Sequence, residues 1–303
     1  MEEYTQGEIN LKDLIGFLLK YKFLVSTITS VGAILSVLFA LSLPNYYQSS
    51  ALLKPTESNS SSSALSQFGG LASLAGIKMP SGTSSETQLV IETLRSRDFL
   101  ERIILNHDIL AGLLATDYFD HAKGEIVHDT EQYDNAKKIW IRDVNYPFKP
   151  KPSVLEAYET YMETVIVEHN EITDYITIYV EHKSPIFAKD FLEIIILELN
   201  KSLREKAYVE ADMAVNYLRE EIVNEKINSL KEALVQLTES QLNTQMITNI
   251  KDDYAVTIVD KPYVPEKKSK PQRSVICIIG TILSFFISLL IAYFIDRRKR
   301  YEG

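Results

Sequence analysis

The sequence predicts an α+β domain with a membrane-proximal sheet and a long projecting helix, placed between two transmembrane helices. Three observations lead to this fold class. Two separate runs of 21 residues, 23–43 and 275–295, contain no charged side chain. Residues 163–181 alternate apolar and polar side chains around a short polar turn, as a β-hairpin does. Residues 186–250 contain neither proline nor glycine and are rich in strong helix formers.

The composition excludes some classes of protein. The 303 residues include 32 basic and 41 acidic side chains, a net charge of -9, so the basic excess of a nucleic-acid binder is missing. The single cysteine, Cys277, lies inside the second uncharged run and forms no intrachain disulfide. A large domain without disulfides must be held together by its own core or by oligomerisation.

Each uncharged run has the length of a membrane span. At about 1.5 Å per residue, a helix of either run is about 30 Å long, which matches the hydrocarbon core of a bilayer. A cleaved signal peptide is the alternative for the first run, but the apolar part of such a peptide usually has only ~7–15 residues. A buried core helix is the alternative for the second run, and the abrupt charged run at 296–300 argues against it.

Basic residues near the first span predict the orientation of the chain. Lys12, Lys20 and Lys22 precede this span, and only Lys54 follows it closely. The side richer in basic residues stays cytoplasmic, so the N-terminus is predicted to be cytoplasmic and the second span returns the C-terminus. Basic residues just before the second span point the other way, but long loops cross largely regardless of charge. The predicted segments are a cytoplasmic amphipathic N-terminus at 1–22, spans at 23–43 and 275–295, an exported domain at 44–274, and a cytoplasmic tail at 296–303.

The first part of the chain mixes helical, strand and loop signals. Residues 8–19 have one apolar helical face, which predicts a helix on the membrane surface or an extension of the first span. Residues 47–54 read as a strand. Residues 58–85 are rich in serine and glycine and predict a loop whose apolar centre docks on another part of the protein.

The middle of the chain begins with helical periodicity at 86–106, interrupted at Ser96. Residues 108–146 are polar and are predicted to be irregular. Ser153, with Glu156 three residues later, forms a capping-box pattern and predicts a short helix that ends at Tyr161.

After the hairpin at 163–181, with Ile176, Ile178 and Val180 on one face, Pro185 occupies a preferred first-turn position of a helix. The prediction is a long helix at about 205–250, about 70 Å at 1.5 Å per residue. A helix of that length must project from the domain, so its apolar seam requires a partner helix, which we expect to be another copy of the chain. The predicted oligomer seam consists of Val215, Leu218, Ile222, Ile227, Leu230, Leu234 and Leu237.

A last strand is predicted at 254–260, followed by an extended proline-rich segment that leads to the second span. The first and last strands each adjoin a span, so they are expected to pair in one sheet near the membrane. Within the second span, small residues would let helices approach closely, namely Gly280, Ser284 and Ser288.

No pattern of catalytic residues is present. The chain has no P-loop, no GxSxG elbow and no HExxH pair. His121 and His128 lie among aspartates, but their spacing fits no standard metal site and favours a solvated loop. We therefore predict no catalytic, cofactor-binding or metal-ligating residue, and no enzyme. The basic cluster Lys267, Lys268, Lys270 and Arg273 is predicted to contact lipid headgroups, or else the diphosphate of a lipid-linked sugar chain.

Several segments resemble one known family. The run VDKPYVPEKKSKPQRSVICIIGTIL contains Pro262, Pro265, Lys268 and Pro271. It resembles the proline-rich segment that leads into the second span of the Wzz chain-length determinants, also called polysaccharide co-polymerases. EINLKDLIGFLLKYKF, FGGLASLAGI, SPIFAKDFLEIIILELN and TQMITNIKDDYAVTIVD resemble other parts of that family. The resemblance covers essentially the whole chain except residues 106–152.

The resemblance implies a function in lipopolysaccharide biosynthesis or a related process. Such a protein regulates the chain length of a surface polysaccharide, O-antigen or similar, made by a Wzy-type polymerase. It acts as a non-catalytic homo-oligomer of the bacterial inner membrane, with its main domain in the periplasm, a coiled-coil helix and no cofactor. The polymerase and the membrane are the implied partners, lipid-linked polysaccharide remains open, and nucleic acid is not a partner. The short tail and the missing P-loop resemble the class without a kinase domain.

Other functions remain as alternatives. A membrane adaptor that activates a separate tyrosine kinase for capsule or exopolysaccharide export would use Tyr301 in the short tail. A transmembrane sensor would need a cytoplasmic signalling module, for which the eight residues after Ile295 leave no room. A glycan-active enzyme would need catalytic groups, and the motif search finds none.

Overall fold

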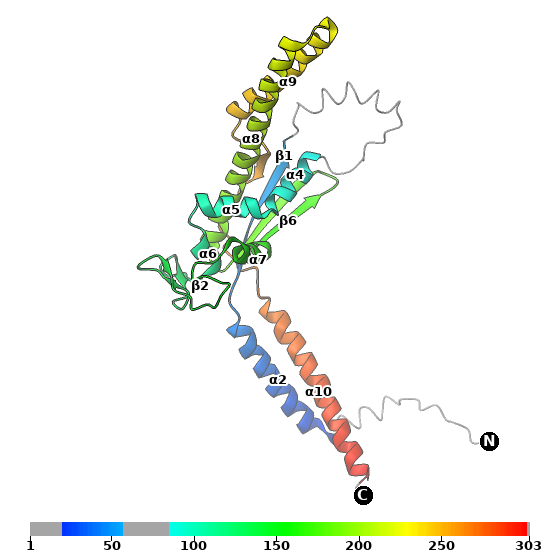
Figure 1. The fold of residues 1–303 in the computed structure, drawn as a ribbon. Coiled ribbons are helices and arrows are strands. Elements are labelled where there is room, and N and C mark those ends of the chain that lie inside the picture. Colours follow the sequence, from blue (N-terminus) through cyan, green and yellow to red (C-terminus); the bar gives the residue numbers. More distant parts are fainter. Residues whose placement is uncertain (1–19, 57–84, 302–303) are drawn as a thin grey trace, which may run out of the picture. The chain divides into compact units, whose positions relative to one another are not determined.

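The computed structural model describes residues 20–56 and 85–301, with the exception of a few side chains at the ends of these ranges. The chain forms two compact units: residues 1–45 together with 268–303, and residues 46–267 (Figure 1). The amphipathic segment predicted at 8–19 and residues 58–84 of the predicted loop lie outside the described residues.

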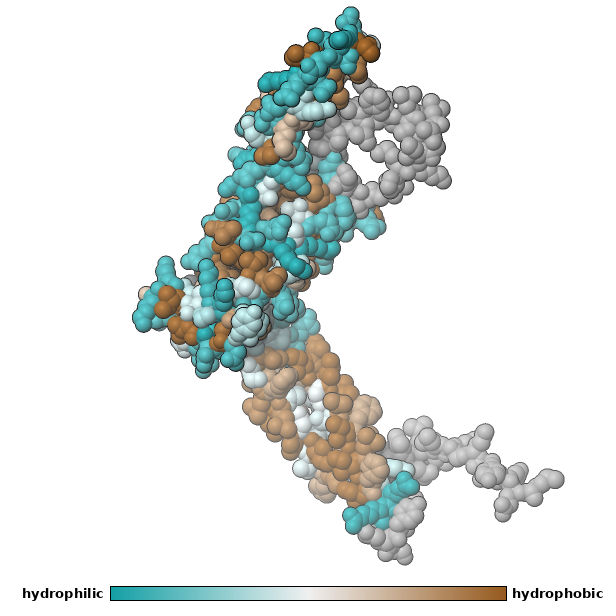
Figure 2. All heavy atoms as spheres, in the orientation of Figure 1, coloured by the Kyte–Doolittle hydropathy of each residue, from teal (hydrophilic) through white to brown (hydrophobic). Residues whose placement is uncertain are grey.

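The first unit contains two long apolar helices, α2 (Lys22–Ser42) and α10 (Arg273–Tyr301), which contain the two predicted spans. In the most apolar window of each helix only 11% of the residues are buried, so neither has the burial of a core helix in a soluble protein. Apolar side chains cover most of the visible surface of the two helices, with residues of intermediate hydropathy among them and hydrophilic residues at one end (Figure 2). Helix α2 ends where Leu43 becomes extended before Pro44, because proline disfavours helical backbone in the preceding residue.

The second unit contains a four-stranded antiparallel sheet in the order β6-β7-β1-β8. The strands are β1 (Tyr47–Pro55), β6 (Val165–Asn170), β7 (Tyr175–His182) and β8 (Val256–Asp260). The predicted pairing of the first and last strands is confirmed: Leu53 lies opposite Ile258 and Pro55 opposite Val256. The predicted hairpin at 163–181 is also confirmed, as β6 and β7.

The core of the second unit lies between one face of this sheet and the first half of a long helix, α8 (Pro185–Asn224). Ile176, Ile178 and Val180 of β7 are fully buried, as their alternation predicts. They pack in one cluster with buried residues of α8 that are spaced three and four positions apart. These residues are Ala188, Phe191, Leu192, Ile195 and Leu199. Pro185 begins α8, and the Ser184 hydroxyl caps it by accepting a hydrogen bond from the amide of Phe187.

Four shorter helices cover the domain: α4 (Ser85–Leu94), α5 (Arg97–Asn106), α6 (Leu110–Leu114) and α7 (Val154–Thr164). The predicted break at Ser96 is confirmed, since this residue ends the first helical segment and its hydroxyl caps α5. The predicted capping box is confirmed as well: Ser153 and Glu156 exchange hydrogen bonds at the start of α7. Helix α7 continues to Thr164, past the predicted end at Tyr161.

The prediction that residues 108–146 are irregular is wrong. They form α6 and two small hairpins, β2 (Thr116–Asp120) with β3 (Glu125–His128), and β4 (Tyr133–Asp134) with β5 (Ile139–Trp140). An aspartate shapes each hairpin turn: Asp120 accepts a hydrogen bond from the amide of Ala122, and Asp134 from that of Ala136. Polar composition conceals these strands, because the residues that make the turns also dominate the segment.

The prediction of one long helix at 205–250 is wrong. Helix α8 ends at Asn224, and a second helix, α9 (Asn228–Ile250), folds back against it (Figure 1). Glu225 turns the chain: its backbone is extended, and its Oε1 accepts hydrogen bonds from the amides of Lys226 and Ile227 at 2.7 and 2.8 Å. The two arms cover part of each other's apolar faces, so a single exposed rod does not form.

Candidate functional site

The two spans pack through small residues that face each other across α2 and α10. A Cβ atom on Gly32 would overlap with the hydroxyl oxygen of Ser284, and one on Gly280 would lie 2.5 Å from the Cβ of Ser36. Each helix thus places a glycine opposite a serine of the other helix, and on each helix the glycine and the serine are four positions apart. Only glycine leaves room for this approach, the known use of small residues in membrane helices.

The predicted packing residues Gly280, Ser284 and Ser288 therefore lie on one face of α10, and the structure brings Gly280 and Ser284 against α2. Ser288 is fully buried, as is Ala292 one turn further on. The residues on α2 were not predicted, although Gly32 and Ser36 show the same spacing as Gly280 and Ser284. This shared spacing is the signal that identifies them.

Polar side chains join the two spans at both ends of the pair. At one end the Asp296 carboxylate, 5% exposed, accepts hydrogen bonds from Lys20 Nζ at 2.6 Å and from the Tyr21 hydroxyl at 2.9 Å. At the other end Arg273 donates to Asn45 Oδ1 at 3.1 Å and to the Leu43 carbonyl at 3.4 Å. Both sets of hydrogen bonds connect segments more than 200 residues apart, so a local sequence pattern does not reveal them.

The proline-rich motif is divided between the two units. In the second unit Pro265 is buried and Pro262 is half-buried. This segment runs beside β1, where the Ser49 hydroxyl donates to the Tyr263 carbonyl at 2.7 Å. In the first unit Lys268 is exposed, with its Nζ 3.4 Å from Asn45 Oδ1, and Pro271 is half-buried just before α10.

The residues of the predicted oligomer seam are split between the two arms of the α8–α9 hairpin. Val215 is buried, and Leu218, Ile222 and Leu234 are half-buried. Three members remain exposed: Ile227 by 60%, Leu230 by 45% and Leu237 by 44%. The hairpin thus covers Val215, Leu218, Ile222 and Leu234 within one chain. It leaves the outer seam, Ile227, Leu230 and Leu237, exposed in the monomer.

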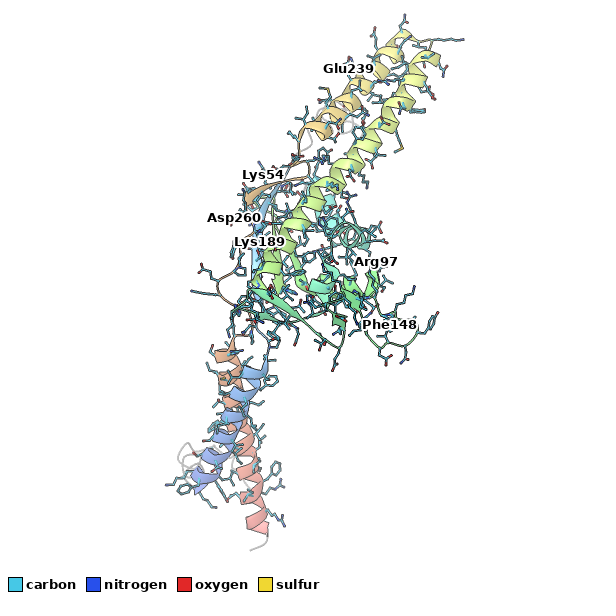
Figure 3. The ribbon with its side chains drawn as sticks, turned by 90° about the vertical axis from the view of Figure 1, so that its left-hand side faces the viewer. Lys54, Arg97, Phe148, Lys189, Glu239 and Asp260 are labelled. Atoms are coloured by element: carbon cyan, nitrogen blue, oxygen red, sulfur yellow. The ribbon has the colours of Figure 1, made fainter. Side chains whose placement is uncertain are left out.

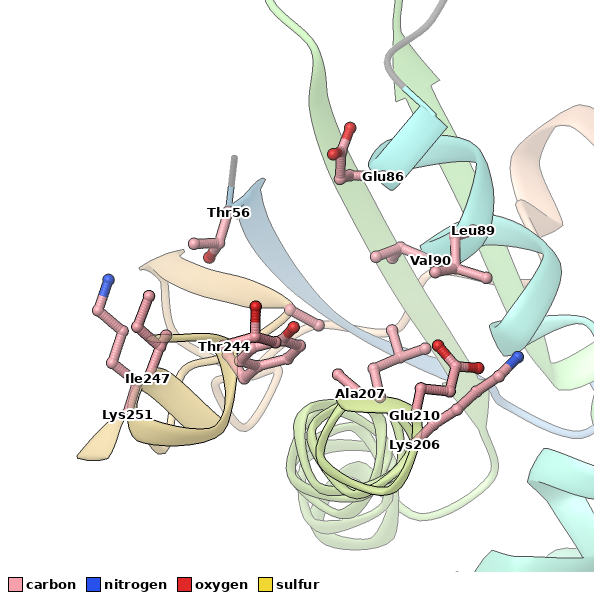
Figure 4. Close-up of a pocket in the computed structure, with 13 residues that line it drawn as sticks. Thr56, Glu86, Leu89, Val90, Lys206, Ala207, Glu210, Thr244, Ile247 and Lys251 are labelled. Atoms are coloured by element: carbon pink, nitrogen blue, oxygen red, sulfur yellow. The ribbon is translucent and has the colours of Figure 1, made fainter. Parts of the chain in front are cut away.

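The base of the hairpin borders a pocket of about 260 Å³ between α4, α8 and the end of α9 (Figure 4). Its apolar lining includes Leu89, Val90, Leu203, Ala207 and Ile247, and its charged lining consists of Glu86, Lys206, Glu210 and Lys251. Burial of the Tyr254 phenol, and then the nearby charge of Glu210, raise the pKa of Tyr254. The lining contains no histidine or cysteine, and it offers apolar contacts together with charges of both signs.

The histidines considered for a metal site lie at opposite ends of the β2–β3 hairpin. His121 Nε2 is 2.9 Å from the Tyr47 hydroxyl, whereas His128 packs against Tyr133 with ring centroids 5.2 Å apart. Burial lowers the pKa of His128. Among the described residues, no three histidine, cysteine or acidic side chains are grouped so that they could hold a metal ion.

A buried acidic residue on α8 was missed by the sequence analysis. Glu198 is 2% exposed, and its carboxylate accepts hydrogen bonds from Arg102 at 2.8 Å and Asn106 at 3.2 Å, while His107 Nε2 lies 3.0 Å from it. Arg102 also donates a hydrogen bond to Glu205, which lies about two turns after Glu198 on α8. This cluster fixes α5 on α8, and its members are about 90–100 positions apart in the chain, so a local sequence pattern does not reveal it.

Comparison with known proteins supports one part of the sequence reading. Residues 7–107 match the family model Wzz, described as chain length determinant protein, and this confirms the resemblance over that third of the chain. No curated protein matches. Among solved structures, a full-length bacterial polysaccharide co-polymerase is 13% identical with a TM-score of 0.41, covering 97% of this chain and all of its own. A fragment of the polysaccharide co-polymerase WzzB from Salmonella Typhimurium is 13% identical with a TM-score of 0.27, covering 75% of this chain and all of the fragment.

Proposed function

We propose that this chain, which carries the match to the Wzz chain length determinant family at residues 7–107, regulates the chain length of a surface polysaccharide. The polymer is O-antigen or a similar glycan made by a Wzy-type polymerase. The family match is the observation that carries the proposal. Two apolar helices on either side of one folded domain are consistent with a membrane protein of this kind.

In this proposal the chain acts without catalysing a reaction, in the bacterial inner membrane. Both termini lie in the cytoplasm and residues 46–267 lie in the periplasm. The orientation is supported by Lys12, Lys20 and Lys22 before the first span and by the basic run at 297–300 after the second. Regulation then depends on the shape of an assembly and its contacts with the polymerase.

The assembly in this proposal is a homo-oligomer built through the α8–α9 hairpin. Ile227, Leu230 and Leu237 expose large apolar side chains near or beyond the turn, and Val223 is 81% exposed beside them. Several large apolar side chains exposed on one hairpin support a role as an interface. A second copy presents the same side chains, so such an interface would bury the outer seam of both hairpins.

The polymerase, in the same proposal, contacts the outer faces of the spans. Their inner faces are taken up by Gly32, Ser36, Gly280 and Ser284, which pack on each other. The basic residues before α10 contact anionic headgroups in this arrangement, since each such residue at a membrane surface contributes about 1 kcal/mol. Arg273 and Lys268 are positioned for this role by Asn45.

A deletion strain tests the proposal. We expect a gel of surface polysaccharide from cells that lack this gene to show an unregulated spread of lengths, and wild-type protein to restore a tight band of long chains. An Ile227→Asp/Leu230→Asp variant should insert in the membrane normally and fail to restore the band. Glu239→Lys, on an exposed polar position of the same hairpin, is the matched control. Unchanged polysaccharide in the deletion strain would contradict the function, whereas restoration by the double variant would contradict only the hairpin interface.

A further inference from the structure

A short exposed loop at the edge of the domain has a composition unlike its surroundings. All seven residues from Asn145 to Lys151 are exposed, and they include two aromatic side chains and two lysines. Tyr146 is 96% exposed and Phe148 is 55% exposed. Neither aromatic side chain belongs to the core of the domain.

The loop is held in place by a single arginine. Arg142 donates hydrogen bonds to the carbonyls of Lys149 and Pro150, each at 2.9 Å, and to the Glu156 carboxylate at 2.9 Å. Glu156 also belongs to the capping box of α7, so the loop is tied to the start of that helix. Although burial raises the pKa of Glu156, hydrogen bonds from Arg142 and Ser153 lower it overall, which keeps the carboxylate charged. The hydrogen bonds of Arg142 therefore hold the loop that exposes Tyr146 and Phe148.

The charge around the loop is opposite to that of the domain. Between the two predicted spans the chain has 25 basic and 35 acidic residues, yet residues 137–151 contain five basic side chains and one acidic. Lys149 and Lys151 are exposed and have no ion pair among the described residues. Arg142 and Lys137 are paired with Glu156 and Asp134, so the charge of the loop itself comes from Lys149 and Lys151. Two lysines beside two aromatic side chains complement an anionic surface that has an apolar layer beneath it.

The position of the loop within the domain places it on the side from which the chain continues to the spans. The chain enters the domain at Tyr47, the first residue of β1, whose hydroxyl is 2.9 Å from His121 Nε2 in the turn after β2. Tyr47 follows the end of α2 at Ser42 by five residues, which span at most about 18 Å when fully extended. Figure 3 shows Phe148 at the end of the domain opposite Glu239, which lies on the hairpin.

We propose that the loop 145–151 is a membrane-contact loop that binds a bilayer containing anionic phospholipid. Tyr146 and Phe148 insert among the headgroups, where amphipathic and aromatic side chains are favoured, and Lys149 and Lys151 pair with lipid phosphates. This proposal depends on the spans being membrane-embedded and not on the control of glycan length.

A tryptophan placed in the loop tests the contact in full-length protein reconstituted into lipid nanodiscs. The single tryptophan, Trp140, is replaced by phenylalanine, and the probe is Phe148→Trp. Ile172→Trp is the control: Ile172 is 96% exposed, more than Phe148, but it lies in the β6–β7 turn at the far end of the sheet from Tyr47. Brominated phospholipids quench tryptophan that enters the bilayer. We expect strong quenching of Phe148→Trp, at most a small effect on Ile172→Trp, and loss of quenching when the nanodiscs contain only zwitterionic lipid.

The charges of the loop are tested in the same assay. Lys149→Glu/Lys151→Glu should lower the quenching of Phe148→Trp to the level of the Ile172→Trp control, with an unchanged far-ultraviolet circular dichroism spectrum. If the Trp140→Phe background does not fold, Phe148→Cys in a Cys277→Ser chain, labelled with a polarity-sensitive dye, gives the same readout. Absence of quenching in a folded protein overturns the proposal. A spectral change that requires added surface oligosaccharide, or one that depends on protein concentration and not on lipid, also overturns it and assigns the loop to glycan or to a second copy.

Discussion

The side-chain amide of Gln245 donates a hydrogen bond to the carboxylate of Asp212, with 3.0 Å between Nε2 and Oδ1. The two residues belong to opposite arms of the α8–α9 hairpin and are 33 positions apart. Nearer the sheet, Arg204 of α8 makes a second cross-link to Asp252, just after α9, at 2.8 Å. The apolar seam of α8 therefore packs first against α9 of the same chain. This changes the expected effect of a helix-breaking substitution.

Proline at two positions of α9 should have different effects. Leu234→Pro lies inside the helix, where it removes a hydrogen bond and its ring clashes with the preceding turn, at a cost of about 3 kcal/mol or more. Leu230→Pro lies in the first turn, where amides have no helical partner and proline is tolerated. Had residues 205–250 formed one helix, both substitutions would break it equally. Limited proteolysis of the solubilised full chain distinguishes the cases: we expect rapid cleavage within 228–250 only for Leu234→Pro, and equal cleavage of the two would contradict the hairpin.

The turn of the hairpin should depend on the carbonyl or carboxylate oxygen at position 225. Glu225→Ala removes the acceptor for the amides of Lys226 and Ile227, and by analogy with helix caps the loss is about 1 kcal/mol. Glu225→Gln keeps an acceptor oxygen and is the matched control. Hydrogen exchange at the amides of 226 and 227 is the measurement: we expect faster exchange in the alanine variant and near wild-type exchange in the glutamine variant.

A substitution of Ser284 should restore the stability that is lost when Gly32 is enlarged. Gly32→Ala places a methyl group on the Ser284 side chain, and an overpacked contact of this kind costs about 1–3 kcal/mol. Ser284→Gly in addition removes the obstructing atoms, so the double variant should regain most of the stability. Thermal unfolding of the full chain in detergent measures this. The control Val31→Ala changes an exposed neighbour on α2, and a double variant no more stable than Gly32→Ala would show that the two helices do not meet there.

The Glu198 cluster should make the domain sensitive to acid. Burial raises the pKa of Glu198, but hydrogen bonds from Arg102, His107 and Asn106 outweigh it and leave the pKa below the ordinary 4.5. A carboxyl with a lowered pKa in the folded state stabilises the protein above its ordinary pKa, and this contribution is lost as the pH falls through the folded value. Melting temperature as a function of pH checks it: Glu198→Gln should lower the melting temperature at pH 7 and flatten its fall below pH 4.5.

Glu193→Gln on the same helix is the control for that experiment. Glu193 makes an ion pair with Lys189 at 2.7 Å, but its side chain is 49% exposed, and exposed pairs contribute little to stability. We expect its melting curve to follow the wild type at every pH. A Glu193 variant that behaves like the Glu198 variant would show that general charge, and not the buried cluster, controls the acid response.

The parts of the fold that the sequence predicts are those written in local patterns. The spans follow from uncharged runs, the capping box from Ser153 and Glu156, and the hairpin of β6 and β7 from alternation. The pairing of β1 with β8 follows from a topological argument, since each strand adjoins a span. These elements can be predicted from the sequence because each pattern contains both the residues that form the element and those that end it.

The parts that the sequence misses depend on contacts between distant residues or on unusual turns. The turn between α8 and α9 contains neither glycine nor proline to mark it in the sequence. The Glu225 carboxylate accepts hydrogen bonds from the amides of the turn instead. Glu198 becomes a buried residue only when α5 packs over it. For the span interface, the small residues on α10 were predicted, whereas Gly32 and Ser36 on α2 were not, although they have the same glycine–serine spacing.

The hydrogen bond between Ser49 and Tyr263 has a consequence for the connectivity of the domain. It joins the segment by which the chain arrives from α2 to the segment by which it departs toward α10, so the two ends of residues 46–267 lie side by side. A domain with adjacent ends tolerates circular permutation. The chain could be closed by a short linker between these ends and reopened in the Asn170–Asp174 turn, which would yield the domain free of its anchors with the sheet order unchanged.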